Sequence, residues 1–369
     1  MIDTRLLLVT PRFPPQIGGV ERYAESLARC LSRLGVEVTV FTTSGTRGVT
    51  HREFFDEVPI VRFPSLAPGE LYYFSWRVLV SLLNASGFDL VHALQYQSFS
   101  SLAVALASRR NRIPCVLTTH LGYFKVGLFA HRAYSYVGRF IVQQMAKVIV
   151  VSPHEVEVLH RLGVQVRDKA VYVPNGVDQA FFNVARRGNS RKLLFVGRLE
   201  KYKGVQSILQ ALRHLRDEDT ELLVAGDGPY RVELESMAQR LGLKQQVSFL
   251  GRVHGKRLLG LFEECSLLVL PSLYESLPIT VLEALASGMP VICSRIPGLR
   301  HLVVDYESGL TLADPTDHLE LAEKISCLLG DDARLREYGQ KARENVQGFS
   351  WENVASKTLE VYRTALGDR

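Results

Sequence analysis

The chain has 369 residues, of which 47% are hydrophobic and 22% charged, and its formal net charge is +6. This length and composition are sufficient for two folded α/β domains and exclude a disordered or low-complexity protein. The five cysteines are scattered, odd in number and without metal-ligand spacing, which predicts reduced core thiols. No apolar segment has the length of a membrane span and the opening residues lack the pattern of a secretory signal, so we expect a cytoplasmic protein.

The excess positive charge lies entirely in the first half of the chain. Residues 1–178 contain nineteen Lys or Arg against thirteen Asp or Glu, whereas residues 179–369 contain twenty-five of each. No acidic residue occurs between Asp89 and Glu155. This distribution predicts an anionic partner for the first half, and a basic, solvated face without a partner is the alternative.

Strand-like apolar runs alternate with helical patterns through the first half. The predicted strands are 5–10, 36–42, 60–63, 90–93, 115–119, 148–151 and 170–173, and the predicted helices are 20–34, 74–84, 98–109, 133–146 and 154–162. This alternation is typical of a mainly parallel sheet with helices on both faces. The sequence Pro-Asn-Gly-Val-Asp at 174–178 then interrupts the pattern, and we place the domain boundary there.

A second alternation follows the boundary. The predicted strands are 193–196, 221–225, 247–250, 266–271 and 291–294, and the predicted helices are 205–215, 231–241, 256–264, one that begins near Pro278, and further helices from 315 onward. Residues 351–365 have the pattern of a last amphipathic helix, with Val354, Leu359, Val361 and Tyr362 on its buried face.

Two carboxylates stand out in the stretch 266–294. Glu283 is the only charged residue between Ser276 and Ser294, and a carboxylate in such an apolar helix needs a partner. Glu275 lies just past the carboxyl end of a strand, where ligands bind in open α/β sheets. Because a carboxylate can accept both hydroxyls of a vicinal diol, the pair predicts recognition of a sugar or ribose. The alternative is that Glu275 complements the helix N-terminus and Glu283 pairs with a buried arginine.

Three further loops carry candidate ligand-binding residues at strand ends. Gly18 and Gly19 precede the first helix, where glycine lets a ligand approach backbone N–H groups. His120 follows the strand 115–119. Arg198 and Lys203 flank the loop before the helix 205–215, and two cations at a helix N-terminus predict a diphosphate site. A Lys-rich surface loop is the alternative at this last position.

The motifs of several other enzyme classes are absent from the sequence. It contains neither the dinucleotide fingerprint G-x-G-x-x-G nor a P-loop. Asp217-Glu218-Asp219 lies between a helix and a strand, where a solvated turn is expected, so we predict no catalytic metal. A leaving diphosphate would then be neutralised by Arg198, Lys203 and helix dipoles. Gly-Asp-Gly-Pro at 226–229 is interpreted as a tight turn.

Together these features resemble the retaining nucleotide-sugar glycosyltransferases of family 4. The matching motifs are GGVE at 18–21, His120, PNGVD at 174–178, VGRLEKYKG at 196–204, GDGP at 226–229, FLGRV at 249–253 and Glu-x7-Glu at 275–283. The resemblance implies an α/β protein of the GT-B fold, with two Rossmann-like parallel-sheet domains facing each other across a cleft. Residues 1–178 would form the acceptor domain, completed by the C-terminal helix at 350–369, and residues 179–349 the nucleotide-sugar donor domain.

The resemblance also implies a role for each candidate residue. Arg198 and Lys203 would hold the donor diphosphate, Glu283 the ribose hydroxyls and Glu275 the transferred sugar. The other implied donor contacts are the backbone of Leu277, Pro278 and Ile279 beside the sugar and phosphate, Gly18 and Gly19 facing the diphosphate, His120 against the sugar, and Gly251, Arg252 and Val253 near the base. Family members commonly have Phe-Gly where this chain has Leu277-Pro278, which removes one backbone N–H.

The implied reaction moves a hexosyl unit from a UDP- or GDP-sugar to an acceptor hydroxyl with retention of configuration and without a cofactor or metal. No acid lies near His120 in the sequence, so we do not expect a carboxylate nucleophile. The family is thought to use attack on the face from which the phosphate departs, with that phosphate as base. A sugar-nucleotide epimerase or hydrolase of the same fold, and a non-catalytic sugar-binding protein, are the alternatives.

Aromatic and basic residues interleave within the acid-free span of the first half. They are Tyr123, Phe124, Phe129, Tyr134, Tyr136 and Phe140 with Lys125, Arg132 and Arg139, and a second aromatic cluster is Tyr72, Tyr73, Phe74 and Trp76. This combination predicts a lipid-linked acceptor, such as a polyprenyl diphosphate-sugar or a glycolipid, met at an anionic membrane surface on the cytoplasmic face. Core packing with a soluble anionic acceptor is the alternative. We expect no nucleic-acid partner.

Overall fold

The computed structural model describes residues 4–16, 18–44, 48–66, 73–121, 128–186, 190–215, 219–300 and 302–367, with the backbone alone for 128–134. By its internal contacts the chain divides into two units. The first contains Met1–Gly176 and Trp351–Arg369, and the second contains Val177–Ser350. The boundaries predicted from the sequence, at 178 and 350, lie within two residues of this division.

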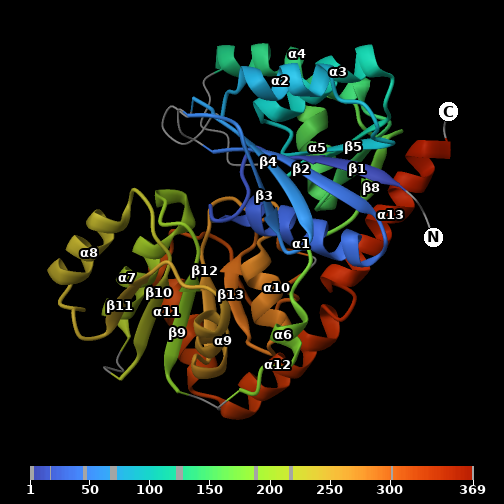
Figure 1. The fold of residues 1–369 in the computed structure, drawn as a ribbon. Coiled ribbons are helices and arrows are strands. Elements are labelled where there is room, and N and C mark those ends of the chain that lie inside the picture. The colour runs from blue at the N-terminus through green and yellow to red at the C-terminus, as the bar shows by residue number, and fades with distance from the viewer. Residues whose placement is uncertain are drawn as a thin grey trace. The chain divides into compact units, whose positions relative to one another are not determined.

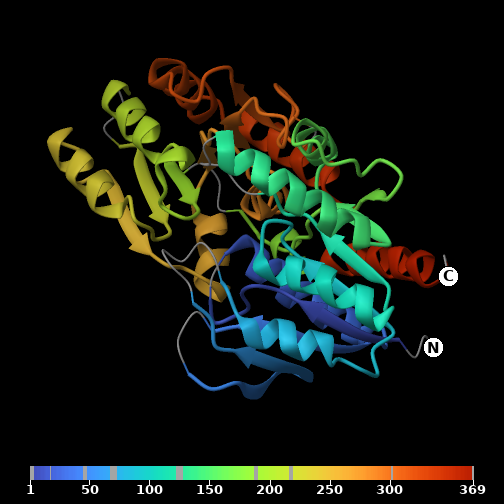
Figure 2. The same ribbon diagram turned by 90° about the horizontal axis from the view of Figure 1, so that it is seen from above.

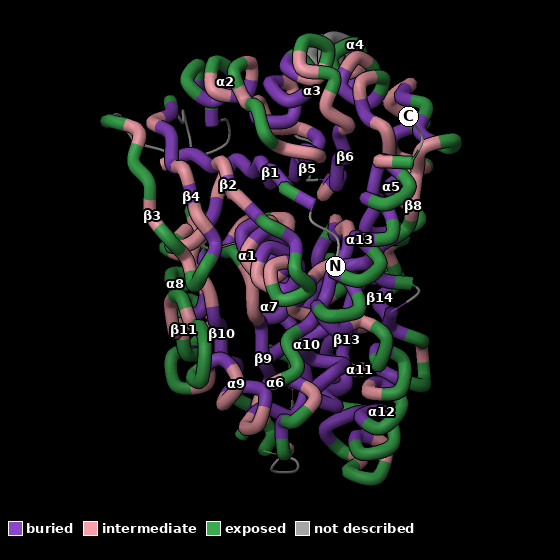
Figure 3. The backbone as a smooth tube through the Cα atoms, turned by 45° about the vertical axis from the view of Figure 1, so that its right-hand side comes forward, coloured by how far each residue is buried: buried purple, intermediate pink, exposed green. Residues whose placement is uncertain are grey.

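The first unit is built on an eight-stranded sheet. Its strands are β1 (Arg5–Val9), β2 (Glu37–Thr43), β3 (His51–Phe55), β4 (Val58–Phe63), β5 (Leu90–Leu94), β6 (Cys115–Thr118), β7 (Lys147–Val150) and β8 (Ala170–Tyr172). They lie in the order β3-β4-β2-β1-β5-β6-β7-β8, and all neighbours are parallel except β3 and β4. The central strands are buried on both faces, as their continuous apolar runs predict (Figure 3).

Helices cover both faces of this sheet. They are α1 (Gly19–Arg33), α2 (Trp76–Leu83), α3 (Phe99–Asn111), α4 (Leu128–Gln144), α5 (Pro153–Arg161) and α13 (Trp351–Gly367). Figure 1 shows α2, α3 and α4 on one face and α1 and α13 on the other, and Figure 2 shows α2, α3 and α4 side by side. Strand order reverses at β1, which places the loop after β1 at the switch point of the sheet.

The last helix, α13, packs on the first unit through its apolar side. Val354, Leu359, Val361 and Tyr362 are all buried, as the amphipathic pattern predicts. The Tyr362 hydroxyl also lies 2.6 Å from Nδ1 of His92 on β5, so a buried polar contact reinforces the apolar one. His92 and Tyr362 are both fully buried, and each gives the other the hydrogen-bond partner that a buried polar group needs.

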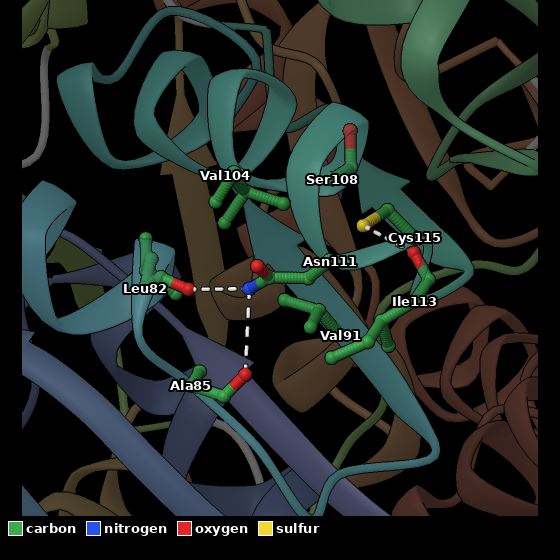
Figure 4. A pocket seen from close by; sticks show the side chains of 9 residues that line it. Leu82, Ala85, Val91, Val104, Ser108, Asn111, Ile113 and Cys115 are labelled. Carbon is green, nitrogen blue, oxygen red and sulfur yellow. Dashed lines mark hydrogen bonds between the residues drawn. The ribbon is translucent and has the colours of Figure 1, made fainter.

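One side chain forms hydrogen bonds between the C-terminal ends of α2 and α3. Asn111 Nδ2 donates to the carbonyl oxygens of Leu82 at 2.7 Å and Ala85 at 3.4 Å (Figure 4). The space beside Asn111, lined mainly by apolar side chains, is a cavity of about 10 Å³. Its size suits a single water and no larger ligand, so it is a packing gap beside the two helices.

The second unit contains a six-stranded, wholly parallel sheet. Its strands are β9 (Lys192–Val196), β10 (Glu221–Ala225), β11 (Val247–Gly251), β12 (Leu267–Leu270), β13 (Val291–Ser294) and β14 (Gly309–Leu312), in the order β11-β10-β9-β12-β13-β14. Its helices are α6 (Gln179–Phe182), α7 (Val205–His214), α8 (Arg231–Arg240), α9 (Gly255–Glu264), α10 (Ile279–Ala286), α11 (His318–Leu329) and α12 (Asp332–Asn345), and a 3-10 turn spans Lys201–Lys203. Right-handed crossovers place α7 and α8 on one face and α9 and α10 on the other.

Most predicted elements lie within two residues of the observed ones, but the sequence prediction omitted three. The edge strand β3 reads His-Arg-Glu-Phe-Phe, and its polar, half-exposed residues lack the apolar pattern of a buried strand. The strand β14 has four residues and begins with glycine, and α6 has only four residues. Short or edge elements such as these are stabilised by their neighbours more than by their own pattern.

Candidate functional site

The main candidate site of the second unit lies where its strand order reverses. The strands β9 and β12 are parallel neighbours, although residues 197–266 lie between them in the chain. The loops after them, 197–204 and 271–278, therefore leave the same edge of the sheet side by side (Figure 1). This is the switch point at which open α/β sheets bind ligands.

A buried ion pair joins these two loops. Lys203 Nζ donates a 2.6 Å hydrogen bond to Glu275 Oε1, and the two side chains are 15% and 9% exposed. Burial alone lowers the Lys203 pKa, but the Glu275 charge and hydrogen bond outweigh it and leave this pKa above its ordinary value. The stabilisation that this raised Lys203 pKa represents is therefore present at neutral pH and is lost as the pH rises through the folded pKa.

Backbone contacts hold the two loops in place. Leu273 N–H donates to the carbonyl oxygen of Tyr202 at 2.8 Å. Gly204 has a φ of +80° and ends the 3-10 turn, and a side chain there would overlap the Pro271 carbonyl oxygen. Glycine alone fits this position without strain, so Gly204 sets the direction in which Lys203 leaves the loop.

The turn predicted at 226–229 contains a 3.1 Å hydrogen bond from Arg231 N–H to the Gly228 carbonyl oxygen, and it also contacts the loop that carries Arg198. Leu199 N–H donates to the carbonyl oxygen of Asp227, and Tyr230 N–H donates to that of Leu199, both at 3.0 Å. The loop thus supports the backbone next to Arg198. The Arg198 side chain is 41% exposed and forms an ion pair with Glu200 at 3.3 Å, so it remains accessible to a solvent-borne anion.

The remaining candidates of the 275–283 motif lie at or in helix α10. Pro278 is the N-cap residue, and Leu277 and Ile279 on either side of it are buried. The first N–H groups of a helix have no intrahelical acceptor, and Pro278 removes the one at the cap itself. Glu283 lies in α10 as predicted and is fully buried, and its assignment to the ribose stays a prediction.

Gly251, Arg252 and Val253 lie at the end of β11, two strands away from β9. Gly251 has a φ of +67°, and its carbonyl oxygen accepts a 2.7 Å hydrogen bond from Gly226 N–H. Arg252 is exposed and Val253 half-buried. All three are therefore at the same carboxyl edge of the sheet as Arg198 and Lys203, and their proposed contact with the base stays a prediction.

In the first unit, Gly18 and Gly19 lie at the start of α1 beside a buried ion pair. Arg12 Nε lies 2.6 Å from Oε1 of Glu21, whose carboxylate is fully buried. A side chain on Gly18 would overlap this carboxylate, whereas one on Gly19 would meet no atom within 4 Å. A side chain on Gly18 would therefore require the Glu21 carboxylate to move, whereas the space in front of Gly19 is open to a ligand.

We expect Gly19→Ala to separate folding from ligand binding. Alanine fits the first turn of α1 without a clash and is a better helix former than glycine, so the melting temperature should stay constant or rise slightly. If a donor phosphate approaches this N–H, the added methyl should lower kcat/KM by roughly 10-fold or more. Thermal unfolding and donor turnover measure the two effects, and an unchanged kcat/KM would remove Gly19 from the site.

His120 follows β6 in a conformation that few residues adopt. Its φ is +40°, and its ring packs edge-on against the Tyr23 ring with centroids 4.3 Å apart. Burial lowers the His120 pKa to about 3, so the imidazole is neutral at physiological pH. Its Nε2 is buried and has no hydrogen-bond partner among the described residues, which leaves it available to a ligand.

No acid lies near His120 in the sequence, but one lies near it in the structure. Glu155, 35 residues later in the chain, accepts hydrogen bonds from both neighbours of His120, the Thr119 hydroxyl and the Leu121 N–H. The strands β6 and β7 are adjacent in the sheet, so the chain after β7 returns Glu155 to the loop after β6. Distance along the sequence concealed this proximity.

Two other residues, which lie where strands of the two sheets end, were not identified from the sequence. Gln97, in the loop after β5, has a buried Nε2 without a hydrogen-bond partner among the described residues. Gly298, after β13, packs so closely on the backbone of Glu275 and Ser276 that any side chain would overlap it. The polar run after β5 and the Pro-Gly pair at 297–298 were the available signals.

Several predicted features lie partly or wholly outside the described residues. They are Tyr72, Tyr123, Phe124 and Lys125, the side chains of Phe129, Arg132 and Tyr134, and residues 217 and 218 of the acidic turn. Within the described ranges, no group of three or more His, Cys, Asp or Glu side chains could hold a metal ion. No described helix is both long enough and apolar enough to cross a membrane.

Both halves of the chain match family models of glycosyltransferases. Residues 17–181 match the family model "Glycosyltransferase Family 4" and residues 177–345 the model "Glycosyl transferases group 1". A D-inositol 3-phosphate glycosyltransferase from Xylanimonas cellulosilytica is 30% identical over 389 residues, covering 94% of this chain and 92% of that protein.

Two solved structures have the same fold. A sucrose-phosphate synthase from Thermosynechococcus elongatus has a TM-score of 0.82 at 24% identity, covering 99% of this chain and all of that one. The Anabaena protein HepE, in complex with UDP-glucose, has a TM-score of 0.79 at 20% identity, covering 97% and 99%. The two parallel-sheet units thus have the GT-B fold of a glycosyltransferase, as predicted. The chain belongs to the family 4 glycosyltransferases.

Proposed function

We propose that this glycosyltransferase moves a hexosyl unit from a UDP- or GDP-sugar to an acceptor hydroxyl with retention of configuration. The observation that carries the proposal is the buried pair of Lys203 and Glu275 at the switch point of the second unit, with Arg198 on the same loop as Lys203. A cation for phosphate and a carboxylate for hydroxyls are the two groups that a nucleotide sugar requires. The complex of HepE with UDP-glucose supports this class of donor.

Departure of the nucleoside diphosphate is the step that these cations assist. As the glycosidic C–O bond breaks, negative charge grows on the phosphate, and Arg198 and Lys203 stabilise it together with the N-termini of α7 and α10. Lys203 is already fixed by Glu275, so little reorganisation is required during the reaction. These groups suffice for the charge of a diphosphate, and we propose that the enzyme needs no metal.

Retention without a carboxylate nucleophile is compatible with the acids of the first unit. Glu21 is ion-paired with Arg12, and Glu155 accepts three hydrogen bonds from its own unit. Both carboxylates are buried and engaged, which makes them poor nucleophiles. We therefore propose attack of the acceptor on the face from which the phosphate leaves, with the leaving phosphate as base and His120 against the donor sugar.

Nucleotide binding tests the donor site before any acceptor is known. UDP, GDP and ADP, each with its glucose and mannose derivative, are added to the protein, and unfolding is followed by calorimetry. A bound donor at 100 times its Kd stabilises the native state by about 2.7 kcal/mol. We expect one nucleotide to raise the unfolding temperature of wild type and not that of Glu283→Ala. If no nucleotide has an effect, the donor site is wrongly assigned.

Product analysis distinguishes transfer from the related activities. A transferase gives product only when acceptor is present, a hydrolase releases free sugar without it, and an epimerase returns an isomeric nucleotide sugar. A sugar-binding protein would bind without turnover. These outcomes separate the proposed activity from its alternatives of the same fold.

For the acceptor, we propose a lipid-linked sugar or glycolipid met at the cytoplasmic membrane surface. The supporting feature is the α2–α4 surface, which we define by exposed apolar and basic residues on or beside three neighbouring helices that contain no acid. They are Phe74, Trp76, Val80, Leu106, Tyr136 and Val137 with Arg77, Arg109, Arg110 and Arg139. Exposed aromatic rings beside arginines suit an interface of anionic lipid.

We expect the α2–α4 surface to bind anionic vesicles in a flotation assay at low salt. Trp76→Ser should lower the bound fraction because it removes an exposed aromatic ring from the surface. The double change Arg109→Glu/Arg110→Glu should also lower it, because each basic residue contributes about 1 kcal/mol, roughly fivefold in binding. Phe54→Ser is the matched control, because Phe54 is also in the first unit and is 75% exposed against 63% for Trp76. Equal binding by all variants, or none by wild type, would contradict the membrane proposal.

A further inference from the structure

Glu155 has a position that the transfer reaction as described does not use. It lies in the first turn of α5 with only 1% of its surface exposed. Oε1 accepts from Leu121 N–H at 2.8 Å, and Oε2 accepts from Val151 N–H at 2.8 Å and from the Thr119 hydroxyl. One buried carboxylate therefore joins the loop after β6 to the end of β7.

The residue between two of these donors is His120. Thr119 is also fixed by its N–H, which donates to the Ile149 carbonyl at 3.0 Å, so the chain is held before His120 as well as after it. A left-handed conformation costs roughly 1–2 kcal/mol for a residue other than glycine, and it persists only where surrounding contacts enforce it. The hydrogen bonds of Glu155 to both neighbours supply that enforcement.

The imidazole ring depends on this backbone conformation. It packs against Tyr23, whose ring also contacts Trp351 at the start of α13 with centroids 5.5 Å apart. A change of φ at His120 would move the ring away from Tyr23 and redirect Nε2. Because the imidazole is neutral, its direction rather than its charge is what the surrounding groups must preserve.

We propose that Glu155 is a positioning residue, which fixes the backbone of His120 and thereby the direction of its ring during glycosyl transfer. The inference rests on the proposed function, in which His120 contacts the donor sugar. Glu155 itself touches no reacting atom, since its two oxygens are occupied by Thr119, Leu121 and Val151. Its role is therefore exerted through His120 alone.

The test compares Glu155→Gln with Glu157→Gln. The glutamine at 155 keeps the volume but has one acceptor oxygen in place of two, so its amide would face one of the N–H donors. Glu157 lies on the same helix with its side chain 67% exposed and is the matched control. The readouts are the imidazole ¹⁵N signals of His120, assigned with His120→Gln, and kcat in the wild-type and His120→Ala backgrounds.

In the wild-type background we expect Glu155→Gln to shift or broaden the His120 ring signals and to lower kcat by about 10- to 100-fold. In the His120→Ala background the same change should lower kcat less than about twofold, because the group it positions is absent. Glu157→Gln should change neither readout. An equal loss in both backgrounds, or a loss of thermal stability with unchanged ring signals, would overturn the proposal.

Two further arms keep the result interpretable. If Glu155→Gln does not fold, Thr119→Val decides, because it removes one of the three donors and should shift the same ring signals and lower kcat severalfold. If wild type turns over no nucleotide sugar, the proposed function has failed. The His120 ring signals then become the only test of whether Glu155 positions His120. Unchanged His120 signals in Glu155→Gln would refute positioning in that case as well.

Discussion

Replacing Lys203 with alanine is expected to lower kcat/KM for the donor by roughly 100-fold and the free energy of unfolding of the second unit by about 3 kcal/mol. The first effect follows from the loss of a fixed cation at the leaving phosphate. The second follows because the Glu275 carboxylate, 9% exposed, would be left buried without its cation. Donor kinetics and urea unfolding measure the two effects separately.

Two variants show whether these effects belong to the buried pair. Lys201→Ala is the matched control, because this exposed lysine lies in the same 3-10 turn, and it should change both quantities little. In Lys203→Ala/Glu275→Ala no buried charge remains unpaired, so part of the stability should return while activity stays lost. Equal effects of Lys201→Ala and Lys203→Ala would reduce the site to an ordinary basic loop.

Lowering the pH from 7 to 5 is expected to destabilise the first unit by several kcal/mol. Burial lowers the pKa of both His92 and His120 to about 3, whereas in the unfolded chain histidine titrates near 6.5. Between these values the unfolded state binds protons that the folded state does not, so stability is complete above pH 6.5 and falls as the pH decreases. The slope is about 1.4 kcal/mol per pH unit for each histidine.

Tryptophan fluorescence reports this loss selectively, because Trp76 and Trp351, the two tryptophans of the chain, both belong to the first unit. Urea unfolding at pH 7, 6 and 5 should show a slope equivalent to two protons in wild type and one in His120→Ala. A midpoint that does not move between pH 7 and pH 5 would show that these histidines are not held neutral by the fold.

Much of the fold was predictable because parallel strands buried on both faces are continuous apolar runs. The strands β10 and β13 begin and end at the residues that the pattern predicts. By contrast, β3 was missed because an edge strand needs no apolar alternation, and Glu53 on it pairs with Arg62 of β4. The stability of such a strand comes from its neighbour, which a local pattern does not contain.

The candidate site was predictable in its parts but not in its contacts. Arg198, Lys203 and Glu275 follow strands, and a ligand site at the carboxyl ends of parallel strands is a general property of this architecture. That Lys203 and Glu275 bind each other depends on the adjacency of β9 and β12, which only the sheet order reveals. For the same reason the proximity of Glu155 to His120 could not be predicted, because it depends on the adjacency of β6 and β7 and not on the sequence around His120.

The most direct test of the central claim is nucleoside diphosphate release from the panel of UDP-, GDP- and ADP-sugars, with EDTA present and a glycolipid extract as acceptor. We expect release from at least one donor, with the new glycosidic bond in the anomeric configuration of the donor, and release at least 100-fold slower in Lys203→Ala than in Lys201→Ala. Inverted product, or equal release by these two variants, would contradict the claim.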